Sequence, residues 1–142
     1  MGVILAIDYG EKRTGIAATD PLQIIASGLT TLPTKEVIPF LKQYCQEQQV
    51  DCCVIGQPKQ LDNSPSLVEP KIQQFIQQLT KQLPSLVITR YDERFTSKMA
   101  FQSMIDGGVK KQGRKNKGLI DKISATLLLQ SYLDASLHSK KK

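Results

Sequence analysis

The first nineteen residues constrain the fold most strongly, because two β-rich apolar runs lie there on either side of a short turn. The runs cover residues 3–9 and 14–19, and the four residues from Gly10 to Arg13 are typical of a hairpin turn. A third strand is expected at about residues 26–32. Because the connections are short, the sequence predicts an antiparallel meander at the start of the chain.

Predicted helices and strands alternate after this meander. Apolar residues recur there at helical spacing, and short apolar runs between them are typical of buried strands. The helices are expected at about residues 37–45, 68–83, 96–107 and 119–133, and the strands at residues 50–55 and 86–91. This order indicates parallel strands with crossover helices. We therefore expect an α/β fold with a mixed five-stranded sheet, antiparallel over its first three strands and flanked by helices.

The helix expected at residues 68–83 has two further features. Ser66 and Glu69 have the spacing of a capping box, which predicts that the helix begins there. The apolar residues mark one face of the helix, and its other face is rich in glutamine.

Length and composition restrict the class of protein. The 142 residues match one domain, so we expect a single domain over residues 1–138 and a basic tail over residues 139–142. The single histidine, His138, excludes chemistry that needs several histidines. Cys45, Cys52 and Cys53 include no C-x-x-C pair and are interpreted as reduced core residues. No apolar run could span a bilayer and no signal peptide is recognisable, so we expect a cytoplasmic protein that makes no membrane contact.

Positive charge is concentrated in the last third of the chain. Residues 1–93 carry 8 basic and 10 acidic side chains, whereas residues 94–142 carry 11 basic and 3 acidic ones. Residues 110–117 alone place five cations in eight positions, between glycines. Such a run is either a solvated charge cluster or a surface for a polyanion. One surface of the folded domain should therefore be markedly positive, and nucleic acid is the partner that this surface favours.

Three carboxylates stand at positions where a catalytic site could form. Asp8 ends the first strand on the same face as Ile4 and Ala6, Glu93 follows the last expected strand, and Asp121 lies near the start of the last helix. Each also has an ordinary structural explanation: a turn residue, an ion pair with the adjacent arginine, or a favourable charge at a helix N-terminus. Together, however, they could bind Mg²⁺ or Mn²⁺, which prefer hard oxygen ligands. Such a metal site suits phosphodiester hydrolysis by a two-metal mechanism.

Four segments of the chain resemble one known family. Residues 6–17 read Ala-Ile-Asp-Tyr-Gly-Glu-Lys-Arg-Thr-Gly-Ile-Ala and resemble the opening motif of the YqgF/RuvX family, RuvC-like members of the RNase H-like superfamily. The resemblance continues in residues 54–58 (Val-Ile-Gly-Gln-Pro) with Asp62 and Ser64, in residues 92–97 (Asp-Glu-Arg-Phe-Thr-Ser) and in residues 121–125 (Asp-Lys-Ile-Ser-Ala). Asn63 stands where the family usually has Gly, and Ser124 replaces the first Ala of the last motif. Neither departure removes an acidic residue.

The resemblance implies an RNase H-like fold and a metal-dependent nuclease. Asp8, Glu93 and Asp121 would be its catalytic and metal-binding residues, with Mg²⁺ or Mn²⁺ as the cofactor. The family is linked to maturation of the 5′ end of pre-16S rRNA in ribosome biogenesis, so the expected partner is pre-rRNA or a ribosomal precursor particle. The family was first proposed to resolve Holliday junctions, which leaves four-way DNA in recombination and repair as the alternative substrate. The chain is expected to be a monomer or a homodimer.

Basic residues near these motifs are expected to bind the phosphates of the nucleic acid. Lys12 and Arg13 follow the first motif and Arg94 follows Glu93, although Arg94 could equally pair with Asp92. The basic run contributes the other candidates, which are Lys110, Lys111, Arg114, Lys115 and Lys117.

Two other classes of function remain open in the sequence. The pattern Asp-x-Gly-x-x-x-Thr-Gly from Asp8 to Gly15 also resembles the phosphate motif of actin-like ATPases and sugar kinases. Those enzymes close two lobes over a nucleotide, and 142 residues make only one. A non-catalytic nucleic-acid-binding module would need only the basic loop, but the three acidic residues speak against it.

Overall fold

Five strands form one mixed sheet in the part of the chain that the structure describes. The computed structural model describes residues 2–57, 67–92 and 117–140; in the last range it describes the side chains of residues 122–135. The strands are β1 (Val3–Asp8), β2 (Arg13–Thr19), β3 (Ala26–Pro33), β4 (Val50–Gln57) and β5 (Ile88–Asp92). Their order across the sheet is β3-β2-β1-β4-β5. The pairs β1/β2 and β2/β3 are antiparallel, and β1/β4 and β4/β5 are parallel, which confirms the predicted meander followed by parallel strands.

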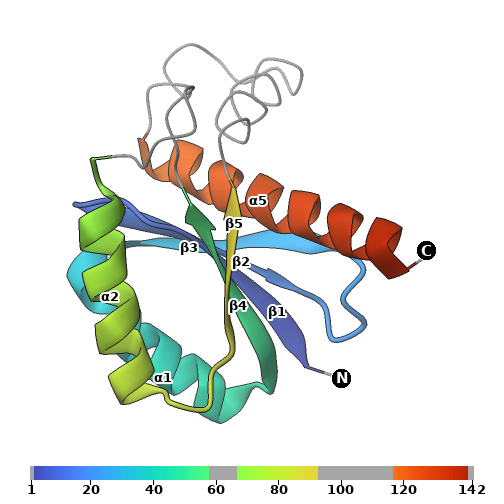
Figure 1. The fold of residues 1–142 in the computed structure, drawn as a ribbon, viewed down its shortest axis with the longest axis horizontal. Helices are drawn as coiled ribbons and strands as arrows, with labels where there is room; N and C mark the ends of the chain where they lie inside the picture. Colours follow the sequence, from blue (N-terminus) through green and yellow to red (C-terminus); the bar gives the residue numbers. More distant parts are fainter. Residues whose placement is uncertain (1, 58–66, 93–116, 141–142) are drawn as a thin grey trace.

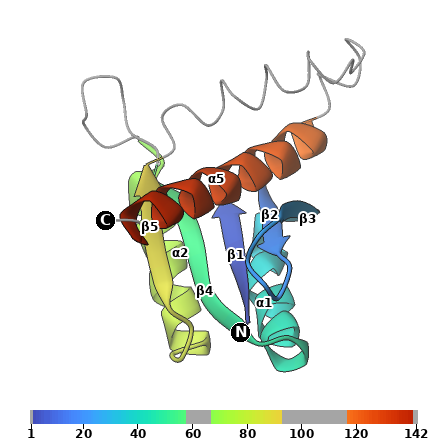
Figure 2. The same cartoon turned by 90° about the vertical axis from the view of Figure 1, so that its right-hand side faces the viewer.

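Helices cover both faces of this sheet. A short 3₁₀ turn, η1 (Thr34–Glu36), leads into α1 (Val37–Glu47), and α2 (Glu69–Gln82) connects β4 to β5. The last helix, α5 (Lys117–Lys140), is longer than the sequence predicted. Helices α1 and α2 lie on one face, and α5 crosses the other face (Figures 1 and 2).

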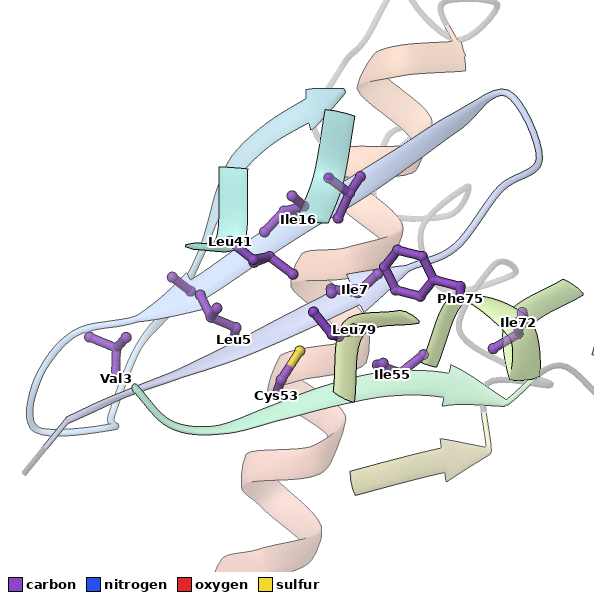
Figure 3. Close-up of a cluster of buried hydrophobic side chains, with 12 residues drawn as sticks. Val3, Leu5, Ile7, Ile16, Leu41, Cys53, Ile55, Ile72, Phe75 and Leu79 are labelled. Carbon is purple, nitrogen blue, oxygen red and sulfur yellow. The ribbon is translucent and has the colours of Figure 1, made fainter. Parts of the chain in front are cut away.

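The alternation of side chains along the strands explains the two layers. On β1, Leu5 and Ile7 point toward α1 and α2, while Ile4 and Ala6 point toward α5. The first core, drawn in Figure 3, includes large aliphatic residues of the strands together with Leu41, Ile72, Phe75 and Leu79 of the two helices. The second core is built partly from alanines, which allow α5 to approach the sheet closely.

The start of α2 differs from the prediction. The helix begins at Glu69 with Val68 as its N-cap, and no side chain caps it. Ser66 lies outside the described residues, and the carboxylate of Glu69 accepts hydrogen bonds from Arg90 and Gln73. The capping box is therefore wrong, because Glu69 is the first residue of the helix and its side chain serves a tertiary ion pair.

Two further expectations concern a helix predicted in the second half of the chain and the absence of a membrane-spanning helix. The helix predicted at residues 96–107 lies outside the described residues. Among the helices that are described, none combines the length and apolar character needed to cross a membrane.

Candidate active site

Asp8 lies at the carboxyl end of the central strand, and its direct neighbours on the two adjacent strands are glycines. Its partner across the antiparallel pair is Gly15 of β2. On the other side Ile7 pairs with Ile55, so the next residue of β4, Gly56, lies beside Asp8. Because side chains alternate along a strand, Asp8 shares the α5 face with Ala6. The glycines on both sides place no side chain directly beside this partly buried carboxylate.

The turn after Asp8 is held by a small ring of hydrogen bonds. The Gly10 N–H donates to Oγ1 of Thr14 at 3.4 Å, and this hydroxyl is hydrogen-bonded to Oγ1 of Thr34 at 2.9 Å. The Thr34 hydroxyl in turn donates to the carbonyl oxygen of Gly10. A Cβ atom on Gly10 would lie 2.2 Å from the carbonyl oxygen of Arg13, so only glycine fits there. The Gly-x-x-x-Thr part of the motif thus has a structural role: it fixes the turn that follows Asp8.

Thr34 is a site-supporting residue that sequence reasoning missed. It comes from η1, beyond the end of β3, and its backbone N–H also donates to the Lys12 carbonyl at 3.0 Å. Only the pairing of β2 with β3, in which Arg13 faces Pro33, brings Thr34 to the turn. No local pattern in the sequence gives a signal for it.

Lys12 and Arg13 occupy this same turn. Lys12 is exposed, and Arg13 is the partly buried first residue of β2. Both cations therefore lie within a few residues of Asp8, at the same edge of the sheet. This arrangement allows either side chain to meet a phosphate group that approaches Asp8.

A second set of contacts, beneath the site, joins β4, β5 and α2. Arg90 Nη1 donates to Glu69 Oε1 at 2.7 Å, and Nη2 donates to Oε2 at 3.0 Å. The same guanidinium reaches the backbone, with Nε 3.2 Å from the Ile55 carbonyl oxygen and Nη2 3.1 Å from that of Gly56. The hydrogen bond from Arg90 lowers the pKa of Glu69, burial opposes this effect, and Gln73 adds a further lowering.

Sequence reasoning also missed this ion pair, because the sequence pattern assigns Glu69 to a helix cap and gives Arg90 no role. The available signal is an arginine within the last strand of the sheet, since a partly buried cation at such a position requires a partner.

The other two candidate carboxylates are only partly located. Glu93 and Arg94 directly follow Asp92, the last residue of β5, and lie outside the described residues. Asp121 belongs to α5, but its side chain is not described. Ser124 and Ala125, next on that helix, are buried, and Ala125 packs in the core that includes Ala6 of β1. The early part of α5 therefore packs on the sheet face that carries Asp8.

Most of the basic run lies outside the described residues. Lys110, Lys111, Arg114 and Lys115 lie outside the described residues, and Lys117 is the first residue of α5, without a described side chain. Within residues 2–57, 67–92 and 122–135, no three His, Cys, Asp or Glu side chains gather where they could hold a metal.

The three cysteines are free thiols set into the fold. Cys53 is fully buried in the first core, and Cys45 and Cys52 are partly buried. Burial raises the pKa of all three thiols, most strongly that of Cys53. Because the thiolate is the reactive form, these side chains are poor nucleophiles. Cys53 lies in the first core and Cys52 packs against the second, as predicted, whereas Cys45 belongs to neither core and lines a surface hollow.

Comparison with known proteins gives a family for nearly the whole chain. The family model described as RuvX, Holliday junction resolvase, matches residues 2–135. A protein of Christiangramia forsetii is 53% identical over 133 residues, which cover 94% of this chain and 98% of that protein. A protein of Phocaeicola vulgatus is 51% identical over 135 residues, which cover 95% of this chain and 97% of that protein. Both relatives bear the name "Putative pre-16S rRNA nuclease".

A solved structure of another protein has the same fold. The Thermus thermophilus RuvC structure in complex with a Holliday junction substrate superposes with a TM-score of 0.58 at 14% identity. The superposition covers 96% of each chain. The RNase H-like fold of RuvC is thus present here, with the mixed sheet and flanking helices that were expected.

Proposed function

This chain belongs to the RuvX family and is a nuclease, and we propose that it acts on the 5′ end of pre-16S rRNA during ribosome biogenesis. The relatives named for that substrate are about half identical to this chain and match it over almost its full length. The RuvC structure solved with a Holliday junction is far more distant in sequence. Sequence proximity therefore favours the RNA precursor over four-way DNA.

The observation that carries the catalytic part of the proposal is the position of Asp8 at the end of β1, between Gly15 and Gly56. A carboxylate oxygen is the donor that Mg²⁺ and Mn²⁺ prefer, and the two glycines place no side chain directly beside it. We assign the remaining ligand roles to Glu93, which follows β5, and Asp121 of α5. Two metal ions held by these carboxylates would activate the attacking water and stabilise the leaving oxygen.

The chain's own residues have distinct tasks in this proposal. The Thr14 and Thr34 hydroxyls fix the turn after Asp8 and so hold its backbone at the end of the strand. Lys12, Arg13 and Arg94 bind phosphates on either side of the scissile bond. The basic run, through Lys110, Lys111, Arg114, Lys115 and Lys117, holds more distant phosphates.

The proposal also covers the domain bounds, the partner, the location and the oligomeric state of the enzyme. One nuclease domain covers residues 1–138 and a basic tail follows over residues 139–142. Pre-rRNA or a ribosomal precursor particle is the partner, the enzyme acts in the cytoplasm, and it is a monomer or a homodimer. A carboxylate set of this kind suits Mg²⁺ and Mn²⁺ alike, so the proposal names both ions.

A second candidate function is resolution of Holliday junctions, which the description of the matching family model favours. A side-by-side assay separates the two: purified protein with Mg²⁺ or Mn²⁺ is given a pre-16S 5′ leader, an unrelated single-stranded RNA and a four-way DNA junction. We expect the leader to be cleaved fastest. Faster cleavage of the junction would favour the second candidate, and binding without any cleavage would favour a non-catalytic module.

A further inference from the structure

A groove runs between α1 and α2, on the face of the sheet opposite α5. It begins under the β1–β2 turn, where Tyr9 and Glu11 line it, and continues between the helices as far as Lys81 and Gln82. Two adjoining hollows make up its length and share Lys35, Ile38 and Gln78, so they form one continuous groove. Figure 1 shows the two helices side by side on this face.

The groove is positively charged, although residues 1–93 carry a small excess of acidic groups. Four lysines line it: Lys35, Lys42, Lys71 and Lys81. Among the described residues that line it, the one acidic side chain is Glu11, which is ion-paired with Lys71 at 3.0 Å. Acidic residues elsewhere in this part of the chain are used in other contacts, such as Glu69 with Arg90. The walls of the groove therefore present a net positive charge.

The glutamine-rich face of α2 gives the groove its second property. Gln74, Gln78 and Gln82 line it at intervals of four residues, about 6 Å apart along the helix axis. The amides of Gln74 and Gln78 can both donate and accept hydrogen bonds, as the edges of unpaired bases require. The side-chain oxygen of Gln82 already accepts a hydrogen bond from Lys42 Nζ at 3.1 Å. Ile38 and Pro39 of α1 add an apolar surface opposite them. Phosphate-binding cations, base-binding amides and apolar surface thus lie along one line.

We propose that this groove binds a single strand of nucleic acid that continues from the scissile bond at Asp8. Tyr9 is the residue after Asp8 and packs on the groove side, where its ring lies 5.3 Å from that of Phe75. A strand bound at Asp8, on the α5 face, therefore passes around the β1–β2 turn to reach the groove on the opposite face. This inference rests on the proposed function and adds a single-stranded flank to the substrate.

The test measures binding separately from cleavage. Fluorescence anisotropy follows a labelled single-stranded RNA and a hairpin duplex in EDTA, at several salt concentrations. The variant Lys35→Ala/Lys81→Ala removes two lysines that have no catalytic role here. Its matched control, Gln46→Glu/Gln77→Glu, lowers the net charge equally at exposed positions that do not line the groove.

For the single strand, we expect the groove variant to bind at least about tenfold more weakly than wild type at low salt. The slope of log K against log salt should fall by about 1.4, or about 0.7 for each phosphate contact that the variant removes. The control should stay within about twofold of wild type, and duplex binding should change little. Equal affinity of the groove variant and the control would overturn the proposal, as would a wild type that does not bind the single strand.

The same proteins separate this inference from the proposed function. If Asp8→Asn abolishes cleavage while the groove variant binds like its control, the nuclease proposal stands and the groove proposal is wrong. If the groove variant alone loses the single strand while wild type cleaves no RNA with Mg²⁺ or Mn²⁺, the groove proposal stands and the proposed function is wrong.

Discussion

Arg90 and Glu69 form a two-armed ion pair that ties the start of α2 to β5, with distances of 2.7 and 3.0 Å between their nitrogen and oxygen atoms. The pair lies on the face opposite Asp8. Through the Gly56 carbonyl oxygen, Arg90 also contacts the residue of β4 that lies beside Asp8. This ion pair, called the Arg90–Glu69 clamp below, therefore supports the ends of the strands on which the site is built.

Breaking this clamp should lower the stability of the whole domain. Arg90→Ala leaves the poorly exposed carboxylate of Glu69 without its main partner, and we expect the free energy of unfolding to fall by about 2–3 kcal/mol. The exposed pair between Glu11 and Lys71 provides the comparison, since Glu11→Gln should cost less than about 1 kcal/mol. Urea denaturation measures both. Equal losses in the two variants would contradict the role given to the clamp.

The same pair predicts how stability depends on pH. The pKa of Glu69 is lowered in the folded state, so the unfolded state binds the proton more readily. The stabilisation is therefore complete above the unfolded pKa of about 4.3 and is lost as the pH falls through the lower folded pKa. We expect wild type to lose more stability between pH 6 and pH 3 than Glu69→Gln does, as measured by urea denaturation at each pH. Parallel pH profiles would show that Glu69 does not contribute in this way.

Gly10→Ala should damage the turn that follows Asp8. The added Cβ would lie 2.2 Å from the Arg13 carbonyl oxygen, so the backbone of the turn must move. We expect a loss of about 1–3 kcal/mol in stability, typical of overpacking, and a clear fall in cleavage rate. Lys12→Ala in the same turn is the control for stability, since this exposed side chain can be shortened without a clash. An unchanged melting temperature for Gly10→Ala would contradict the tight turn.

Patterns local in sequence predicted most of the described fold. The period-two alternation of Ile4, Ala6 and Asp8 correctly indicated one strand face, and the helix on that face is the one that carries Asp121. The hairpin and the parallel strands that follow it were also predicted, because short connections and apolar runs are local signals. The assignments of site residues stay predictions: Asp8, Glu93 and Asp121 as metal ligands, and Lys12, Arg13, Arg94 and the basic run as phosphate-binding residues.

The missed features depend on contacts between distant segments. Thr34 reaches Gly10 only through the pairing of β2 with β3. The capping box was wrong because the tertiary contact with Arg90 takes the Glu69 side chain. The basic groove was missed because the net charge of residues 1–93 is negative, and a net charge summed along the sequence does not show on which face of the fold each lysine lies.

Neutralising the basic run should weaken RNA binding but should not abolish cleavage of the RNA that is bound. Replacing Lys110, Lys111, Arg114, Lys115 and Lys117 by alanine should reduce affinity for RNA and flatten its salt dependence, since every phosphate that is no longer bound lowers the slope for a single strand by about 0.7. Anisotropy titrations at several salt concentrations measure this slope. At saturating protein, cleavage should persist. An unchanged slope would indicate that the run is a solvated charge cluster.

The most direct test of the central claim is the rate at which wild type and Asp8→Asn cleave a pre-16S 5′ leader with Mg²⁺ or Mn²⁺. Removal of a metal-binding carboxylate should slow cleavage at least about a hundredfold, because metal catalysis is worth several kcal/mol. RNA affinity and melting temperature should stay close to wild type. The control Asp134→Asn removes an exposed carboxylate on α5 and should cleave normally. The account predicts metal-dependent cleavage that Asp8→Asn slows at least about a hundredfold and Asp134→Asn leaves unchanged. Cleavage by Asp8→Asn at the wild-type rate would contradict it.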